Sequence, residues 1–211
     1  LICLFLLVIS CKNYEQIEIN AIRKKLDEET HIAFEKKEYN KAIALIDKSI
    51  ELAPELPFAY YNRGRIFLKK GETQKGLQDI SQAILNLDNV TGTPTHKTSR
   101  IYSERAIIYY NLKEYTKASE DINVALKYSP RNEVNISIRL RLYYYLHEFE
   151  LAIEESHKIN NESIYSYEAF FIRIISSINL GKYDLAVSNL ENFIINHEDD
   201  YFGYSILAYA H

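Results

Sequence analysis

The sequence has no methionine and no tryptophan, only two cysteines, and 6 glycines and 4 prolines in 211 residues. So little glycine and proline excludes collagen-like and low-complexity chains, and a hydrophobic fraction of 47% is too high for a disordered one. Lysine and arginine total 25 against 29 aspartates and glutamates, a net charge of −4. Without a basic excess to attract phosphate groups, nucleic acid is not expected as a partner. Because no initiator methionine precedes Leu1, a folded fragment of a longer reading frame is expected.

An unbroken apolar run, LICLFLLVI, occupies residues 1–9 and stops at Ser10 and Cys11. As a helix this run would rise about 15 Å, which is half of the roughly 30 Å hydrocarbon core of a bilayer. It is therefore too short to span a membrane, but its length suits the apolar segment of a secretory signal peptide. Residues 8–11, Val-Ile-Ser-Cys, resemble the bacterial lipobox, in which an aliphatic, a permissive and a small residue precede a cysteine.

The lipobox resemblance implies that Cys11 is the lipidation site. Cleavage before Cys11 would remove the signal peptide 1–10 and free an amino group for acylation, while the thiol carries a thioether-linked diacylglycerol. Two or three acyl chains hold a protein firmly to a membrane. A polar tether over residues 11–22 would follow, and its stretch 12–20 could reach at most about 30 Å. Cys3 would leave with the signal, so no intramolecular disulfide is expected. Alternatively, Cys11 merely lies near a signal or a truncated membrane helix.

A pattern with a period of 34 residues organises the rest of the sequence. One small residue marks each copy, at Ala42, Gly76, Ala118, Ala152 and Ala186. These positions are 34, 42, 34 and 34 residues apart. Three equal steps and one step longer by eight indicate five copies of one unit, with eight extra residues inserted at 91–98.

A second part of the period precedes the small residue in two copies, as Y-x2-R-G-x2-F at 60–67 and Y-x2-R-A-x2-Y at 102–109. Together these segments resemble the tetratricopeptide repeat, whose pattern is W-x2-L-G-x2-Y, then A-x3-F, then P. The resemblance covers about residues 23–211. It implies an all-α fold, a right-handed superhelical solenoid of helix-turn-helix repeats. Thr30 and Leu140 stand where the family prefers glycine or alanine, so looser or shifted helix packing is expected there.

The five expected repeats are 23–56, 57–90, 99–132, 133–166 and 167–200. Residues 201–211 are expected to form the first helix of a sixth repeat or a cap. Each unit reads as two antiparallel helices, which cannot bury both apolar faces alone but can do so when neighbours stack.

No catalytic or metal-binding motif is apparent, so neither an enzyme nor a cofactor is expected. The six histidines never form H-E-x-x-H, and the glycines never form a phosphate-binding G-x-x-x-x-G-K loop. With a single cysteine left after processing, a thiolate zinc site is excluded as well. Acidic runs at 27–29 and 197–200 are interpreted as solvated surface.

The family resemblance implies that the first helix of each unit lines a concave face that binds a protein or peptide partner. Tyrosine and arginine are enriched among interaction hot spots because they combine large rigid area with hydrogen bonds. The expected partner-binding residues are Tyr61, Arg65, Tyr110, Arg141, Tyr144 and Tyr145. Such a groove suits an extended or helical peptide with a few acidic groups. The same tyrosines could instead be core residues wedged between units.

Some family members hold a chaperone's C-terminal carboxylate with a Lys/Asn clamp, which is not recognisable here. Asp27, Tyr61 and Ser103 occupy slots where such a clamp would need basic or amide groups.

The expected function is a non-catalytic scaffold or adaptor, lipid-anchored at the bacterial cell envelope and facing the periplasm or the surface. Two alternatives stay open. The repeats could be the docking or sensory part of a longer enzyme or signalling protein. They could also form a glycan- or nutrient-binding lipoprotein whose tyrosines stack on sugars.

Overall fold

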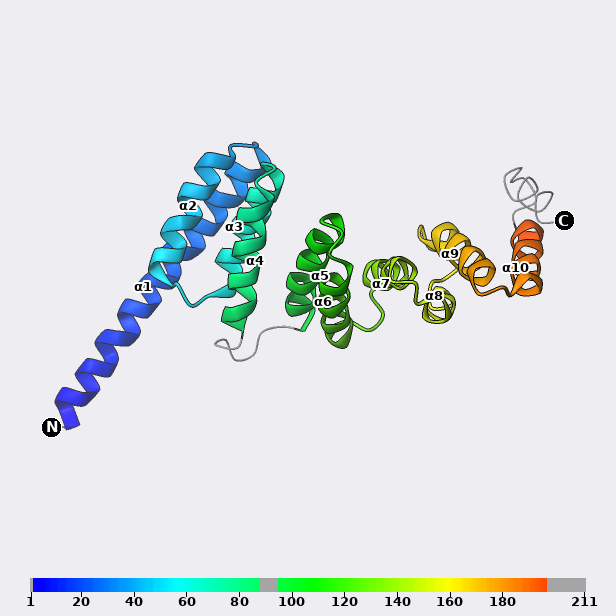
Figure 1. Cartoon of the computed structure of the whole chain (residues 1–211). Coiled ribbons are helices and arrows are strands. Elements are labelled where there is room, and N and C mark those ends of the chain that lie inside the picture. The colour runs from blue at the N-terminus through cyan, green and yellow to red at the C-terminus, as the bar shows by residue number, and fades with distance from the viewer. Residues whose placement is uncertain (1, 88–94, 197–211) are drawn as a thin grey trace. The chain divides into compact units, whose positions relative to one another are not determined.

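The computed structural model describes residues 2–87 and 95–196, which form ten α-helices and no strands (Figure 1). The chain divides into two compact units, Leu1–Pro94 and Thr95–His211. The expected all-α repeat fold is confirmed. The expected sixth helix at 201–211 lies outside the described residues, as do residues 91–94 of the insertion.

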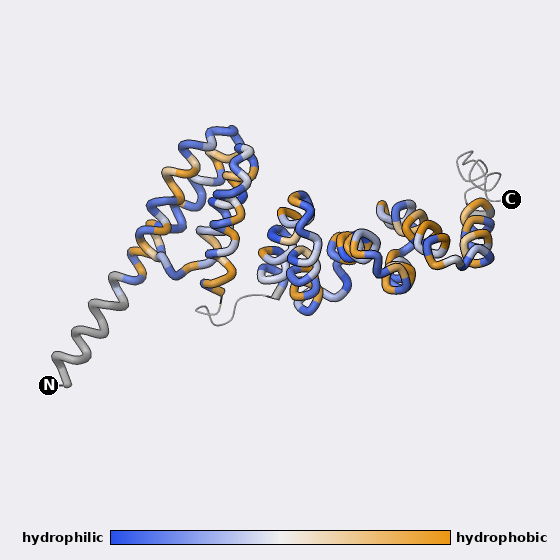
Figure 2. Tube along the Cα trace, viewed as in Figure 1, coloured by the Kyte–Doolittle hydropathy of each residue, from blue (hydrophilic) through white to orange (hydrophobic). Residues whose placement is uncertain are grey.

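Each unit is a succession of helices in which consecutive members pack in pairs. The first unit holds α1 (Ile2–Glu35), α2 (Tyr39–Leu52), α3 (Pro57–Lys69) and α4 (Thr73–Leu87). The second holds α5 (Thr95–Asn111), α6 (Tyr115–Tyr128), α7 (Glu133–Tyr145), α8 (Phe149–Ser156), α9 (Ser166–Asn179) and α10 (Tyr183–Asn196). Polar and apolar residues alternate along these helices (Figure 2), as expected of amphipathic helices that bury one side.

The turn inside every pair has the same backbone conformation. One residue adopts a left-handed conformation with φ between 59° and 82°, at Lys37, Gly71, Lys113, His147 and Gly181. These residues are 34, 42, 34 and 34 apart, so each is the fifteenth residue of its expected repeat. The next residue donates its N–H to the carbonyl five residues back, at 2.8–2.9 Å in all five turns. This is a Schellman motif, which satisfies carbonyls at the end of the first helix.

Small residues let the paired helices approach each other. Ala42, Ala118 and Ala152 are fully buried. A Cβ atom added to Gly64 would lie 2.9 Å from Ile80 Cγ1, so the crossing of α3 and α4 leaves no room for a side chain at Gly64. The period of small residues in the sequence is therefore a period of close helix crossings.

Two repeats lack the small residue at the position where the family prefers glycine or alanine, and they have Thr30 and Leu140 there. Leu140 stands at a small-residue position and is fully buried against Ala152, Ala169 and Ile172. Its partner helix α8 has 8 residues, whereas α2, α4, α6 and α10 have 14 or 15. Thr30, the other exception, is buried and its hydroxyl has no hydrogen-bond partner among the described residues.

Helix α1 runs without a break from Ile2 through Cys11 to Glu35. Its first part, dark blue in Figure 1, extends beyond the other three helices of its unit. The stretch 12–20 of the expected tether is helical, so it rises about 14 Å, within the maximal reach of about 30 Å.

Among the described residues, no helix is both long enough and apolar enough to cross a membrane.

A candidate partner-binding surface

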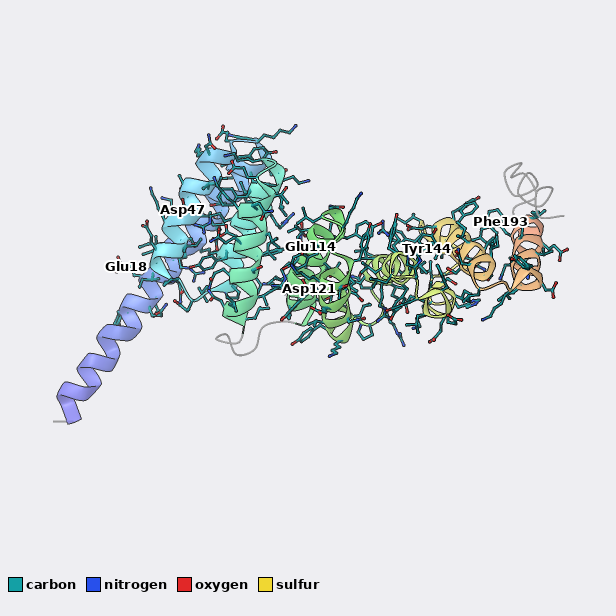
Figure 3. The ribbon with its side chains drawn as sticks, viewed as in Figure 1. Glu18, Asp47, Glu114, Asp121, Tyr144 and Phe193 are labelled. Atoms are coloured by element: carbon teal, nitrogen blue, oxygen red, sulfur yellow. The ribbon has the colours of Figure 1, made fainter. Side chains whose placement is uncertain are left out.

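Five aromatic side chains of the second unit form one cluster, named here the tyrosine cluster. Its members are Tyr110, Tyr115, Tyr144, Tyr145 and Phe149. Tyr110, Tyr144 and Tyr145 lie in the last turns of α5 and α7, while Tyr115 and Phe149 are the first residues of α6 and α8. Because the tight turn places the end of one helix beside the start of the next, stacking of successive pairs brings all five rings together. Figure 3 labels Tyr144 on α7.

The rings of the tyrosine cluster are arranged in contact geometries. Tyr115 and Tyr145 stack with centroids 4.8 Å apart and an interplanar angle of 12°. Tyr110 lies 5.7 Å from Tyr115 and 5.8 Å from Tyr145. Each such pair contributes about 0.5–1.5 kcal/mol beyond the burial of its area. Tyr145 is nevertheless 44% exposed, so the cluster presents aromatic surface to solvent while its rings hold one another in place.

Arg141 gives this surface a positive charge. Its guanidinium carbon lies 5.3 Å from the centre of the Tyr110 ring, within the range of a cation–π contact. Its Nε atom lies 3.4 Å from a carboxylate oxygen of Glu168 on α9, an ion pair in which Nε makes no hydrogen bond. Both side chains are about one-third exposed. Arg141 is therefore held by a ring on one side and only loosely paired on the other.

Burial, and next a hydrogen bond with Tyr145, raise the pKa of Tyr110 to about 12, while Arg141 opposes the shift. Tyr110 is therefore a neutral phenol at physiological pH, able to donate as well as accept a hydrogen bond.

Four of the six expected partner-binding residues, Tyr110, Arg141, Tyr144 and Tyr145, meet in this cluster. The other two lie in the first unit, where the Arg65 guanidinium carbon is 5.8 Å from the centre of the Tyr61 ring. Tyr61 was expected to face a partner, but it is only 5% exposed because α3 packs against both α2 and α4. Its ring therefore offers almost no surface for binding. Of Cys11, the structure describes the backbone alone, within α1.

A hollow of about 110 Å³ in the first unit is lined by Asp27, His31, Asn62 and Arg65, together with Thr30, Phe34, Ile46 and Ile66. Burial raises the pKa of the Asp27 carboxyl, and nearby Arg23 partly offsets that effect. A carboxyl group at this place repels another carboxylate when it is ionised. The hollow thus holds one acid beside the side chains of Arg65 and His31, and the absence of a clamp stays a prediction from the sequence.

The tetratricopeptide repeat family model matches residues 31–56 and 99–132. A tetratricopeptide repeat protein of Parabacteroides merdae has a solved structure with a TM-score of 0.69, 23% identity, and coverage of 90% of this chain and 72% of that one. The solved structure of YrrB, a TPR protein with an unusual peptide-binding site, also has a TM-score of 0.69. It is 14% identical, and the match covers 84% of this chain and 87% of YrrB. Two segments of the chain thus match the tetratricopeptide repeat model, and the described helices have the fold of tetratricopeptide repeat proteins.

Among curated proteins, the Hsp70-Hsp90 organizing protein of Triticum aestivum is 31% identical to this chain over 100 residues. The match covers 47% of the chain and 16% of the relative. The chain thus spans about a sixth of the length of the curated relatives that it matches.

One repeated feature of this chain was missed from the sequence. Where the family has leucine, three repeats have an arginine that pairs with an acid 16 residues later: Arg63 with Asp79, Arg105 with Asp121, and Arg139 with Glu155. The N–H to carboxylate distances are 2.7–3.0 Å, and the three acids are nearly completely buried. The repeated spacing of 16 residues was the signal that could have revealed these pairs, which join the two helices of a repeat.

In the part of the chain that the structure describes, no three histidine, cysteine or acidic side chains are grouped so that they could hold a metal ion.

Proposed function

We propose that this chain is a protein-binding scaffold whose tyrosine cluster, together with Arg141, holds a peptide segment of a partner protein. The observation that carries the proposal is the convergence of five rings and one arginine, from α5, α6, α7 and α8, on a surface where Tyr145 is 44% exposed. Rigid aromatic area beside a guanidinium is the composition typical of interaction hot spots.

The chemistry of this surface selects a class of peptide. An acidic side chain can replace Glu168 as the partner of Arg141, because the existing ion pair is 3.4 Å long and its two side chains are about one-third exposed. An apolar or aromatic side chain next to the acid would cover Tyr145. We therefore expect peptides that carry an acidic residue beside a hydrophobic one. The proposed role is binding without catalysis, as in tetratricopeptide-repeat proteins generally.

A random library of displayed linear peptides tests this proposal. Selected on the purified chain, the library should yield peptides enriched in Asp or Glu next to a large apolar residue. Enrichment of basic peptides, or no enrichment over an unrelated helical protein, would contradict the proposal.

Substitutions then locate the binding surface. Arg141→Glu and Tyr145→Ala should each weaken binding of a selected peptide at least tenfold, because each removes a central contact of about 1.4 kcal/mol or more. Glu168→Gln should strengthen it, because the substitution frees the guanidinium. The matched controls are Arg131→Glu and Tyr183→Ala, which alter an exposed arginine and a 65% exposed tyrosine outside the cluster.

The peptide SRMEEVD is a useful probe, since a related fold, the first TPR of Spaghetti (RPAP3), was solved with this HSP90 peptide. That structure is 18% identical to this chain and has a TM-score of 0.51. SRMEEVD carries acidic residues beside Met and Val, so it belongs to the class of peptide expected above, although Asp27 stands where a carboxylate clamp needs a basic or amide group. We therefore expect any binding of SRMEEVD to use the tyrosine cluster, so that Arg141→Glu weakens it at least tenfold. Binding of SRMEEVD that Arg141→Glu leaves unchanged would contradict this reading of the groove.

We further propose that the scaffold is anchored by a lipid on Cys11 at the bacterial cell envelope. The support is the Val-Ile-Ser-Cys motif at 8–11 after an apolar run. Helix α1 continues through this position, so residues 11–22 would act as a stiff helical spacer between the lipid and the first repeat. Confining the scaffold to a membrane raises the effective concentration of partners held at the same membrane.

Expression of the full-length protein in a bacterium, wild type beside Cys11→Ser, tests the anchor. The intact mass of the wild type should correspond to a chain beginning at a lipidated Cys11, and the substitution should release the protein from the membrane fraction. An unlipidated wild type, or a Cys11→Ser protein that stays on the membrane, would contradict the anchor but would leave the peptide-binding proposal intact.

A further inference from the structure

A fourth arginine occupies the same register as the three paired ones but has no acid to pair with. Arg173 follows Arg139 by 34 residues, at the leucine position of the last repeat. Sixteen residues further on, where the other repeats have Asp79, Asp121 or Glu155, the chain has Asn189.

The neighbours of Arg173 do not replace the missing carboxylate. The amide of Asn189 donates to the carbonyl of Leu185 on its own helix, at 2.8 Å. Two of the paired arginines have a further acceptor 16 residues before them: Arg63 donates to Asp47, and Arg139 donates to Asn123. The residue 16 positions before Arg173 is His157. Within residues 2–87 and 95–196, Arg173 makes no ion pair, and its Nε atom is buried without a hydrogen bond.

The pKa shifts of Arg173 and of its neighbour His157 reflect the missing carboxylate. Burial lowers the pKa of the Arg173 guanidinium, the opposite of the direction seen for Arg63 and Arg105, which face carboxylates. Burial and the charge of Arg173 together lower the pKa of His157. A half-buried guanidinium whose Nε lacks a hydrogen-bond partner is unfavourable, and a carboxylate brought next to it would relieve that cost.

Space for such an anion lies beside the arginine. A hollow of about 340 Å³ between α9 and α10 is lined by Arg173, by Phe193 and by polar side chains that include Ser166, Asn189 and Asn192. Figure 3 labels Phe193 on α10. One acid, Glu162, also lines it, from the exposed turn before α9. The hydroxyl and amide groups can donate further hydrogen bonds to a bound oxygen atom.

We propose that this hollow is a carboxylate-binding site, in which a ligand carboxylate accepts hydrogen bonds from Arg173 in the place that Asp79, Asp121 and Glu155 fill in the other repeats. The planar guanidinium suits a two-oxygen acceptor. The carboxylate can belong to a small organic acid or to an Asp or Glu side chain of a bound protein. The site involves none of the residues of the tyrosine cluster, so its test is independent of the test of peptide binding at that cluster.

Thermal unfolding of the full chain in acetate or succinate, compared with chloride at equal ionic strength, tests the proposal. The carboxylates should raise the Tm of the wild type by several degrees, because a ligand that binds the folded state alone stabilises it. Arg173→Gln should abolish this response. Asn189→Asp should abolish it too while raising the Tm in chloride, because the new acid supplies internally what the ligand supplies in the wild type.

Asn189→Asp keeps the test decisive even if Arg173→Gln fails to fold. Equal carboxylate responses in the wild type and in Asn189→Asp would overturn the proposal, as would no response in the wild type. Glu162→Gln should retain or strengthen the response, because it removes a competing acid, and loss of the response there would also overturn the proposal. The blocked peptide acetyl-Gly-Gly-Asp-Gly-Gly-amide distinguishes the two sources of the carboxylate. A response larger than that to acetate identifies a protein side chain as the natural ligand, and a smaller one identifies a free acid.

Discussion

At the scale of single residues, the pairs of arginine and acid are an uncommon way to join two helices. The Asp121 residue is 4% exposed, and Nε and Nη2 of Arg105 both donate to its carboxylate at 2.7 Å. This geometry satisfies both ions, but a buried ion pair adds little over a well-packed apolar pair. Removing one partner of the ion pair is nevertheless expected to lower the free energy of unfolding, because the other partner is then left buried and charged.

Asp121→Leu should therefore reduce the free energy of unfolding by about 3 kcal/mol, because Arg105 loses its partner. The double variant Arg105→Leu/Asp121→Leu, which restores the family's leucine, should recover most of that loss. Urea denaturation of the three proteins measures both effects. A single variant that loses less than about 1 kcal/mol would show that Arg105 is solvated rather than held by Asp121.

Tyr110 provides a pH-dependent signature of the tyrosine cluster. Burial and the hydrogen bond with Tyr145 raise the pKa of Tyr110 to about 12 from its ordinary value of 10.0, so the folded protein favours the neutral phenol. This contribution to stability is complete below pH 10 and is lost as the pH rises from about 10 through about 12.

Spectrophotometric titration of the wild type beside Tyr110→Phe measures that pKa. We expect the difference between the two titrations to show one tyrosine that ionises near pH 12. A difference centred near pH 10 would contradict the burial of Tyr110 in the cluster.

The sequence alone pointed to Tyr110, Arg141, Tyr144 and Tyr145, because helical spacing from the packing positions indicates which residues of a first helix face outward. It could not show that Tyr61 is buried, since that depends on how α3 packs against its neighbours. It also could not show Glu168 as the partner of Arg141, because the two residues lie on different helices and share no repeated spacing.

At the scale of elements, the turn between the two helices of each repeat sets their antiparallel arrangement. Lys113 and Gly71 occupy equivalent turn positions with φ of 61° and 82°. A left-handed backbone is unfavourable for a residue with a Cβ atom and costs glycine little. The turn geometry is thus kept even in the repeats whose sequence does not favour it.

Lys113→Gly should raise the free energy of unfolding by about 0.5–1 kcal/mol, because glycine adopts this conformation without strain. Gly71→Ala should lower it by about 1 kcal/mol through the backbone alone, because the added Cβ atom would have no heavy atom of another residue within 4 Å. Chemical denaturation measures both changes. A Lys113→Gly protein less stable than the wild type would contradict the conformational account of the turn.

The helix pairs follow from the sequence because small residues, turns and apolar stripes recur with one period. Two features did not follow. Helix α8 ends at Ser156 after 8 residues, although its repeat keeps the spacing of the others. The stretch 11–22 is helical, although its polar composition suggested a tether. Polar composition alone does not distinguish a solvated helix from an extended segment.

At the scale of the whole molecule, the repeats place binding chemistry at intervals along the chain. The tyrosine cluster belongs to repeats 99–132 and 133–166, whereas the unpaired Arg173 belongs to the last described repeat. The proposed lipid on Cys11 lies before all of them. In a scaffold built in this way, the proposed anchor, the proposed peptide surface and the proposed carboxylate site each occupy their own segment of the chain.

The central claim is that Arg141 contacts an acidic side chain of a bound peptide. A double-mutant cycle tests it most directly, with the dissociation constant measured for wild type and Arg141→Gln against a selected peptide and its Glu→Gln counterpart. We expect the two changes to be non-additive, with a coupling of about 1.5 kcal/mol or more, as close charge pairs across interfaces give. Additive losses, within about 0.3–0.5 kcal/mol, would mean that Arg141 and the acid do not meet, and would contradict the account.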